Sequence, residues 1–316
     1  METQTYASFR LRADVIDRGL CPLCGGCAAG CPYLGQQRGR IVQLDCCTLA
    51  EGSCYRNCPR TYTDLDAVSR AVFGEAFSQD DLGIVRGAYL AQATDPETRS
   101  AAGGAGVTAA LLRTALVSGA IDAIPGTGTD GEPNQGIYLR NLAVSSKTSG
   151  SPVPVLLTDP ATVVSHITAP HRFARVLTAF NGLPKESNSH LGMVCLPCQT
   201  ASMRKRLTNA PESRTEVRNV RLLIAESCAT KRWLEPGEDR QVANKACSYC
   251  WDLTGEFADI SIASGRGQQD WNTVLVRTAA GQQAFDAARQ ARAIEVQPLA
   301  AESLAQEKKA SHDKKV

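Results

Sequence analysis

The chain has 316 residues, a formal net charge of +2 and only 5% aromatic residues, and its acidic and basic residues are well mixed. This balance gives no sign of a nucleic-acid or membrane footprint, and no apolar run approaches the roughly 18 residues of a membrane span. The N-terminus also lacks the basic-then-apolar layout of a signal peptide, so we expect a cytoplasmic protein.

The exceptional feature of the composition is its thirteen cysteines. Structural disulfides are rare in a reducing compartment, so this many thiols indicates another use, with metal binding as the leading candidate. The length is sufficient for one large domain plus a small one.

The first cysteines lie in residues 21–32, which read CPLCGGCAAGCP. The spacing Cys-x2-Cys-x2-Cys-x3-Cys-Pro is that of bacterial ferredoxins. Three thiolates two residues apart can wrap one face of a 4Fe-4S cubane, and glycines let backbone amides approach the sulfides. Zinc is the alternative, but four closely spaced cysteines without a second Cys or His pair fit a tetrahedral zinc site poorly.

A second group contains Cys46, Cys47, Cys54 and Cys58. The spacing Cys54-x3-Cys58 before a proline repeats the end of the first run, as in two-cluster ferredoxins. That pattern assigns one cluster to Cys21, Cys24, Cys27 and Cys58, and the other to Cys31 and Cys54 with one or both of Cys46 and Cys47. We take Cys47 as a ligand and leave Cys46 open. One cluster with spare thiols is the alternative.

Composition changes from cysteine-rich to Ala/Val/Leu-rich near residues 60–85. We expect a ferredoxin-like domain over residues 1–62, a connector over 63–84, a large α/β domain over 85–300 and a charged tail over 301–316. The sequence predicts continuous helix from Gln282 onward, and the lysines at its end indicate a solvated tail.

Apolar runs predict strands over these segments: residues 88–91, 154–157, 220–225, the stretch from Cys250 to Ala263, and 272–278. The stretch Thr63-Asp64-Leu65-Asp66-Ala67-Val68 offers an N-cap and then a helix of two or three turns. A Gly-rich turn at residues 103–106 opens another helix that ends near Gly119. Exposed amides at such a start can bind phosphate, although these turns often serve only close helix packing.

The remaining cysteines follow or precede strand-like segments. Cys198 comes after the apolar run at Val194, Cys228 ends the run at 220–225, and Cys247 and Cys250 form a Cys-x-x-Cys pair. Strand ends in an α/β sheet meet at one edge, so we expect these thiols to converge there.

Together these stretches resemble the family of beta subunits of coenzyme F-420-dependent hydrogenases and dehydrogenases, which includes hydroxymethyl chlorophyll reductase. The likeness covers about residues 85–300, and the leading module is similar to those fused to many bacterial members. The matching residues are Pro197-Cys198-Gln199-Thr200 with Arg204, Cys228, Cys247 and Cys250, Asp252, Thr254, Glu256, Ala258-Asp259-Ile260-Ser261, Trp271-Asn272-Thr273 and Val276-Arg277-Thr278.

The resemblance implies a mixed α/β (α+β) fold, in which a large flavin-binding α/β domain follows a small ferredoxin-like iron–sulfur domain. It implies that Cys198, Cys228, Cys247 and Cys250 hold a further 4Fe-4S cluster, which makes two or three in all. It also implies an FAD bound by Gly103, Gly104, Gly106, Thr108, Thr254, Asp259, Trp271, Asn272 and Thr273.

The function implied is that of one subunit of a redox complex. It would exchange hydride between a two-electron carrier and FAD, and pass single electrons through the clusters to a partner. F-420 and NAD(P)H are the candidate carriers. The partner would belong to a hydrogenase, formate dehydrogenase or heterodisulfide-reductase-like assembly. No catalytic side chain is assigned.

Three departures from the family pattern matter. Cys195 is an extra thiol beside Cys198, either a spare or a swapped ligand. Only 18 residues separate Cys228 from Cys247, where many relatives carry a longer insertion, and the Gly-rich turn before Trp271 is shifted. The last two leave the hydride carrier open. The short segment favours an alternative function, an electron-transfer adaptor without its own substrate site.

Overall fold

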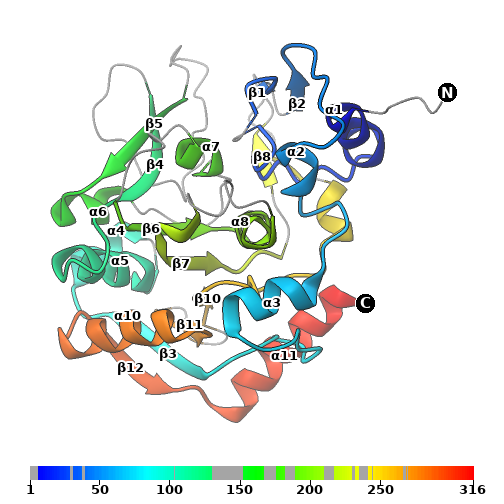
Figure 1. Ribbon diagram of the computed structural model, residues 1–316. Helices are drawn as coiled ribbons and strands as arrows, with labels where there is room; N and C mark the ends of the chain where they lie inside the picture. Colours follow the sequence, from blue (N-terminus) through cyan, green and yellow to red (C-terminus); the bar gives the residue numbers. More distant parts are fainter. Residues whose placement is uncertain are drawn as a thin grey trace.

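The computed structural model describes residues 6–28, 31–37, 40–102, 104–129, 152–166, 176–181, 189–209, 217–229, 232–234, 241–243, 245–265, 268 and 270–316. In Figure 1 a central sheet lies between helices, and a small N-terminal module packs beside it. None of the described helices combines the length and apolar character that a membrane span requires.

The central sheet is mixed and has six strands. They are β3 (Gly87–Ala93), β6 (Leu191–Cys195), β7 (Val220–Glu226), β10 (Ile260–Ser264), β11 (Asn272–Val276) and β12 (Ile294–Pro298), in the spatial order β12-β3-β11-β10-β7-β6. Neighbours β6, β7 and β10 pair in parallel, and the other pairs are antiparallel. The carboxyl ends of β3, β6, β7 and β10 therefore share one edge with the start of β11. This arrangement confirms the mixed α/β fold.

Helices cover both faces of this sheet (Figure 1). Side chains alternate along β7, so Leu222 and Ile224 pack with one set of helices and Leu223 with the other. The first set is α4 (Pro96–Ala102), α5 (Val107–Val117), α6 (Pro160–His166) and α10 (Ala279–Gln290). The second is α7 (Val176–Asn181) and α8 (Pro197–Lys205), with the short turn η2 (Arg206–Thr208) and α3 (Leu65–Phe73) beside α8.

The N-terminal module has its own core, built on Leu11, Val15, Leu34 and Ile41 together with cysteines. Its elements are α1 (Ala7–Leu11), the π-helical turn η1 (Arg12–Ile16), the antiparallel pair β1 (Leu34–Gln37) and β2 (Arg40–Gln43), and α2 (Ser53–Arg56). Two further antiparallel pairs lie elsewhere: β4 (Ile124–Thr129) with β5 (Pro152–Leu157), and β8 (Arg232–Leu234) with β9 (Gln241–Ala243).

Most predicted elements are present: β3, β5, β7, β11 and α5 cover the expected segments. α3 begins as predicted, because the Asp64 side chain accepts a hydrogen bond from the Ala67 amide at 2.9 Å.

The strand expected directly after Cys250 is wrong in its start, since β10 begins only at Ile260. Residues 251–259 instead form a buried turn. The Asp252 carboxylate accepts the Gly255 amide at 2.7 Å and the Glu256 amide at 3.2 Å, and these bonds replace a strand ladder.

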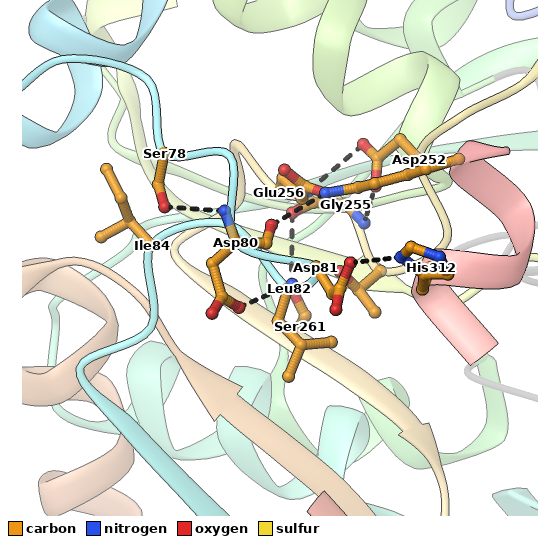
Figure 2. Close-up of polar contacts among 12 residues, drawn as sticks. Ser78, Asp80, Asp81, Leu82, Ile84, Asp252, Gly255, Glu256, Ser261 and His312 are labelled. Atoms are coloured by element: carbon orange, nitrogen blue, oxygen red, sulfur yellow. Dashed lines mark hydrogen bonds and ion pairs between the residues drawn. The ribbon is translucent and has the colours of Figure 1, made fainter. Parts of the chain in front are cut away.

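Continuous helix from Gln282 is also wrong, because β12 separates α10 from α11 (Ala301–Lys315). Residues 301–316, predicted as a charged tail, are mostly the helix α11, drawn in red near α3 in Figure 1. Lys308 pairs with Asp80 at 2.9 Å, and His312 approaches Asp81 at 3.0 Å, a contact that Figure 2 shows. The charges of this helix hold it against the body of the protein.

Candidate metal centres

Four cysteines of the N-terminal module surround one hollow. Cys21, Cys24, Cys27 and Cys58 line one hollow together with apolar side chains such as Leu11. Burial, followed by the charges of Cys24, Cys21 and Cys58, raises the pKa of Cys27. The structure thus brings together the four thiols that the ferredoxin pattern groups.

A second set lies alongside. Burial, then the proximity of Cys31 and, to a smaller extent, Cys47, raises the pKa of Cys54 to about 11. Cys47 is only 4% exposed, whereas Cys46 is exposed and its amide donates to the Asp45 carboxylate. Of the adjacent pair, Cys47 is the thiol that lies inside the module.

The third set gathers at the carboxyl edge of the sheet. Cys198 lies in the first turn of α8, Cys228 follows β7, and Cys247 lies in the 3-10 turn η3 (Lys245–Tyr249) just before Cys250. These four thiols line one hollow of about 310 Å³. The Cys250 amide donates to the Cys247 carbonyl at 3.1 Å, and the Cys228 amide to that of Leu253 at 2.8 Å.

The donor geometry differs from that of a single-ion site. Among the described residues, no three His, Cys, Asp or Glu side chains converge tightly enough to hold one metal ion. Burial also raises the pKa of Cys58 to about 12. Such thiols ionise readily only when bound cations such as iron compensate the charge.

The module is joined to the sheet domain through α8. The Lys205 ammonium donates to the Cys58 carbonyl at 2.8 Å and to the Thr61 hydroxyl at 2.8 Å, and burial lowers its pKa to about 8. The Ser202 hydroxyl donates to the Asn57 carbonyl at 2.8 Å. A Cβ atom added at Gly26 would lie 2.0 Å from that hydroxyl oxygen, so α8 can approach the cysteine loop only because residue 26 is glycine.

A second connection runs through Arg60. Its guanidinium donates to the Ala246 carbonyl at 2.7 Å and to that of Tyr249, which places the end of the module against the Cys-x-x-Cys turn. Pro22 lines both the first and the third hollow. These two thiol sets are therefore neighbours.

Part of the predicted flavin site lies at the same edge of the sheet. Gly104, Gly106 and Thr108 form the entry to α5, and Gly106 has the left-handed φ of 72° that glycine permits. The Thr108 hydroxyl donates to the Glu226 carboxyl group at the end of β7, and burial raises the pKa of Glu226 to about 7. Gly103 lies outside the described residues.

The start of β11 is at this edge too. Trp271 precedes the strand, and the Asn272 side chain donates to the Ala263 carbonyl at 3.0 Å. The hydroxyl of Thr273 is buried without a hydrogen-bond partner in the described part of the chain. An unpaired buried hydroxyl is costly, so this position suits a polar group of a ligand.

Thr254 and Asp259 are held inside the fold. The Thr254 hydroxyl accepts from the Arg277 guanidinium at 2.8 Å, and the Asp259 carboxylate pairs with Arg204 at 2.8 Å and accepts the Leu223 amide at 2.7 Å. Asp259 also precedes β10 and so lies at the edge opposite the α5 entry. The structure does not bring these two side chains together with the other predicted flavin residues.

The structure also shows the surroundings of side chains to which the sequence assigned no contacts. Arg277 is fully buried and also donates to the carbonyls of Leu82 at 2.6 Å and Ile84 at 2.9 Å, two residues labelled in Figure 2. The Lys205 ammonium is held by the module's Cys58 carbonyl and Thr61 hydroxyl. Cys195 is completely buried in the core under α7 and α8.

Comparisons with known proteins agree with this architecture. Residues 230–302 match the model that describes the C terminus of the beta subunit in the coenzyme F420 hydrogenase/dehydrogenase family. The chain is 24% identical over 306 residues to the F subunit of the F(420)H(2) dehydrogenase of Methanosarcina mazei, covering 88% of this chain and 84% of that protein.

A solved structure shares the fold. A chain in the xenon-derivatised F420-reducing [NiFe] hydrogenase complex from Methanosarcina barkeri superposes with a TM-score of 0.59 at 18% identity, over 74% of this chain and 90% of that chain. The matched family region contains Cys247, Cys250 and the start of β11. The C-terminal part of the chain is thus similar to the beta subunits of the coenzyme F420 hydrogenase/dehydrogenase family.

Proposed function

We propose that this protein is the iron–sulfur flavoprotein subunit of a redox complex. It exchanges hydride between a two-electron carrier, F420 or a nicotinamide, and FAD, and it delivers single electrons through two or three 4Fe-4S clusters to a partner subunit. The observation that carries the proposal is the grouping of eleven cysteines into three neighbouring sets, two of which share Pro22 in their walls.

The thiol sets suit iron–sulfur clusters in number, spacing and environment. The first set has four thiols in an apolar hollow, and the third has four at the end of the sheet. The second provides Cys31, Cys47 and Cys54. A bound cluster carries one electron at a time. Arg60 and Lys205 lie where the N-terminal module meets the sheet domain, and their hydrogen bonds fix the distance between the first and third thiol sets.

The carboxyl edge of the sheet suits FAD in part. At the start of α5, no side chain of Gly104 or Gly106 blocks the approach of a phosphate to the backbone amides. A Cβ atom at Gly104 would meet nothing within 4 Å. Thr273 offers an unpaired hydroxyl within the described part of the fold. When bound, FAD would supply the conversion between hydride and single electrons. Thr254 and Asp259 instead form hydrogen bonds with the protein's own groups, the Arg277 guanidinium and the Leu223 amide. They are not part of this edge of the sheet.

The test is the anaerobically purified full-length protein. We expect flavin absorption bands over a broad iron–sulfur shoulder, and bleaching on titration with reduced F420 or NADH. About twelve irons per chain would correspond to three cubanes. A colourless protein, or one that binds only zinc, would overturn the proposal.

A second function has its own support. An electron-transfer adaptor in a hydrogenase, formate dehydrogenase or heterodisulfide-reductase-like assembly would keep the clusters and lack a substrate site. The engagement of Thr254 and Asp259 by buried arginines favours it, because two of the residues matched to the family are unavailable to a flavin. Clusters without flavin, bleached by neither carrier, would establish the adaptor.

A further inference from the structure

The last turn of α11 reaches the third thiol set. We propose that Lys314 is a positioning residue of that site: its ammonium group fixes the Cys228 loop and stabilises the reduced form of the cluster bound there. This inference rests on the proposed iron–sulfur function, and it assigns a role to a segment that the sequence presents only as a charged tail.

The contacts of Lys314 carry the proposal. Its Nζ donates to the Cys228 carbonyl at 2.9 Å and to the carbonyl of Ala229. The same side chain lines the hollow of about 310 Å³ together with the four thiols. Lys314 therefore holds a ligand-bearing loop through its backbone and places a positive charge at the wall of the hollow.

Three contacts of α11 set the position of this lysine. Lys308 pairs with Asp80 at 2.9 Å, and His312 approaches Asp81 at 3.0 Å (Figure 2). The Lys315 ammonium donates to the Asp80 carbonyl at 2.9 Å. Because residues 308–315 of the helix are held against residues 80–81, its last turn meets the site in one orientation.

The neighbouring residue holds the other ligand loop. The Lys315 ammonium lies 2.7 Å from a carboxylate oxygen of Glu256 and 5.8 Å from the centre of the Trp251 ring, and Trp251 follows Cys250 directly. Figure 2 shows Glu256 beside Asp252, whose carboxylate organises the buried turn. Two consecutive lysines thus connect the helix to the Cys228 loop and to the Cys250 loop.

The charge has an electrostatic consequence. Reduction adds one negative charge to a cluster that four thiolates already make anionic. A cation at the wall of a partly buried site interacts more strongly with that charge than it would in water. Loss of the Lys314 charge should therefore make this cluster harder to reduce.

The experiment uses the full-length protein with its clusters. Lys314→Gln removes the charge and keeps a hydrogen-bond donor, and Lys314→Arg keeps the charge. Lys309→Gln is the matched control, since Lys309 is exposed on the same helix and pairs with Asp313 four residues further along it. Redox titration followed by electron paramagnetic resonance gives the midpoint reduction potential of each cluster. The signal that is missing in Cys250→Ala identifies the cluster of the third thiol set.

At the wild-type midpoint, we expect Lys314→Gln to lower the reduced-to-oxidised ratio of that cluster about threefold to tenfold. In Lys314→Arg this ratio should stay close to that of wild type, and Lys309→Gln should leave the ratio unchanged. Lys314→Gln could instead lose iron while Lys314→Arg and Lys309→Gln keep it. That result also supports the proposal, because it shows that Lys314 fixes the Cys228 loop.

Wild-type behaviour of Lys314→Gln would overturn the inference, and so would an equal shift in Lys309→Gln, because only the net charge of the helix would then matter. A wild-type protein without iron at Cys198, Cys228, Cys247 and Cys250 would instead overturn the proposed function. The two failures are distinguished by iron content alone.

Discussion

The thiols of the N-terminal module and those of the sheet domain occupy different kinds of environment. In the module, Cys27, Cys54 and Cys58 are themselves part of a small apolar core with residues such as Leu11 and Ile41. In the sheet domain, the four thiols of the third set are half-buried. The two cores described on either side of the sheet contain none of those four.

On the proposed function, this difference separates a module whose core would be organised around its clusters from a sheet domain that would carry a cluster at its edge. The module has few residues and few regular elements, so we expect its core to depend on the groups that the thiols bind. The sheet domain buries long strands and helices on both faces. The sheet domain should fold whether or not a cluster is bound by the thiols at its carboxyl edge.

The largest expected effect is therefore that of iron removal. When a chelator under reducing conditions strips the clusters, we expect the module to lose its fold while the six-stranded sheet remains. Limited proteolysis should then cut within residues 6–62 and leave a resistant fragment that contains β3 to β12. Simultaneous loss of both regions would show that the sheet domain also depends on its metal.

Cys250→Ala should remove about four irons per chain and leave the module's clusters and the sheet intact. The reason is that Cys250 lies in a loop at the edge of the sheet, outside its described cores. The measurements are iron content and circular dichroism. Cys195→Ala is the control, since that thiol is buried under α7 and α8, and it should keep all the iron. Unchanged iron in Cys250→Ala would reject the ligand assignment.

Within the module, Cys54→Ser should lose iron, and Cys46→Ser should keep it. Cys54 is 2% exposed and lies beside Cys31 and Cys47, whereas Cys46 is exposed. Iron and sulfide analysis of the two variants, prepared side by side, makes the comparison. Equal losses would mean that both members of the Cys46–Cys47 pair contribute to the second site.

The sequence predicts the two environments with unequal success. The ferredoxin spacing groups Cys21, Cys24 and Cys27 with Cys58, and the structure places these four thiols around one hollow. The third set draws on three separated segments. Strand ends indicated its location, because carboxyl ends of parallel strands share an edge.

What sequence could not predict is the long-range polar packing. Asp259 and Thr254 match a family pattern, but only the fold shows that Arg204 and Arg277 engage them. The charged end of the chain has no apolar periodicity that would indicate a docked helix. Its position depends on contacts with Asp80 and Asp81, more than 200 residues away.

The sheet domain should also be the more sensitive region to pH. Burial, then the charge of Asp252, raises the pKa of Glu256 from its ordinary 4.5 to about 7, although Lys315 opposes the shift. The folded state therefore binds more protons than the unfolded state between pH 4.5 and 7, and stability falls as pH rises through that window. Glu256→Gln is neutral throughout and avoids this loss, which amounts to at most about 3 kcal/mol.

The check is the melting temperature of cluster-loaded protein from pH 5 to pH 8. The melting temperature of Glu256→Gln minus that of wild type should increase as pH rises. Glu302→Gln, at an exposed position in the first turn of α11, is the control and should show a constant difference. A difference for Glu256→Gln that does not vary with pH would contradict the prediction.

The smallest effect is expected at the seam between the two regions. Gly26→Ala should cost about 1–3 kcal/mol, because the new methyl group would overlap the Ser202 hydroxyl, 2.0 Å from its Cβ position. Since Ser202 also donates to Asn57, the overlap would push α8 away from the module rather than unfold either part. Electron transfer between the first and third clusters should slow as their separation increases, while iron content stays unchanged. Ser202→Gly in the same chain removes the overlap and should restore the rate; if it does not, the loss comes from the cysteine loop itself and not from its contact with α8.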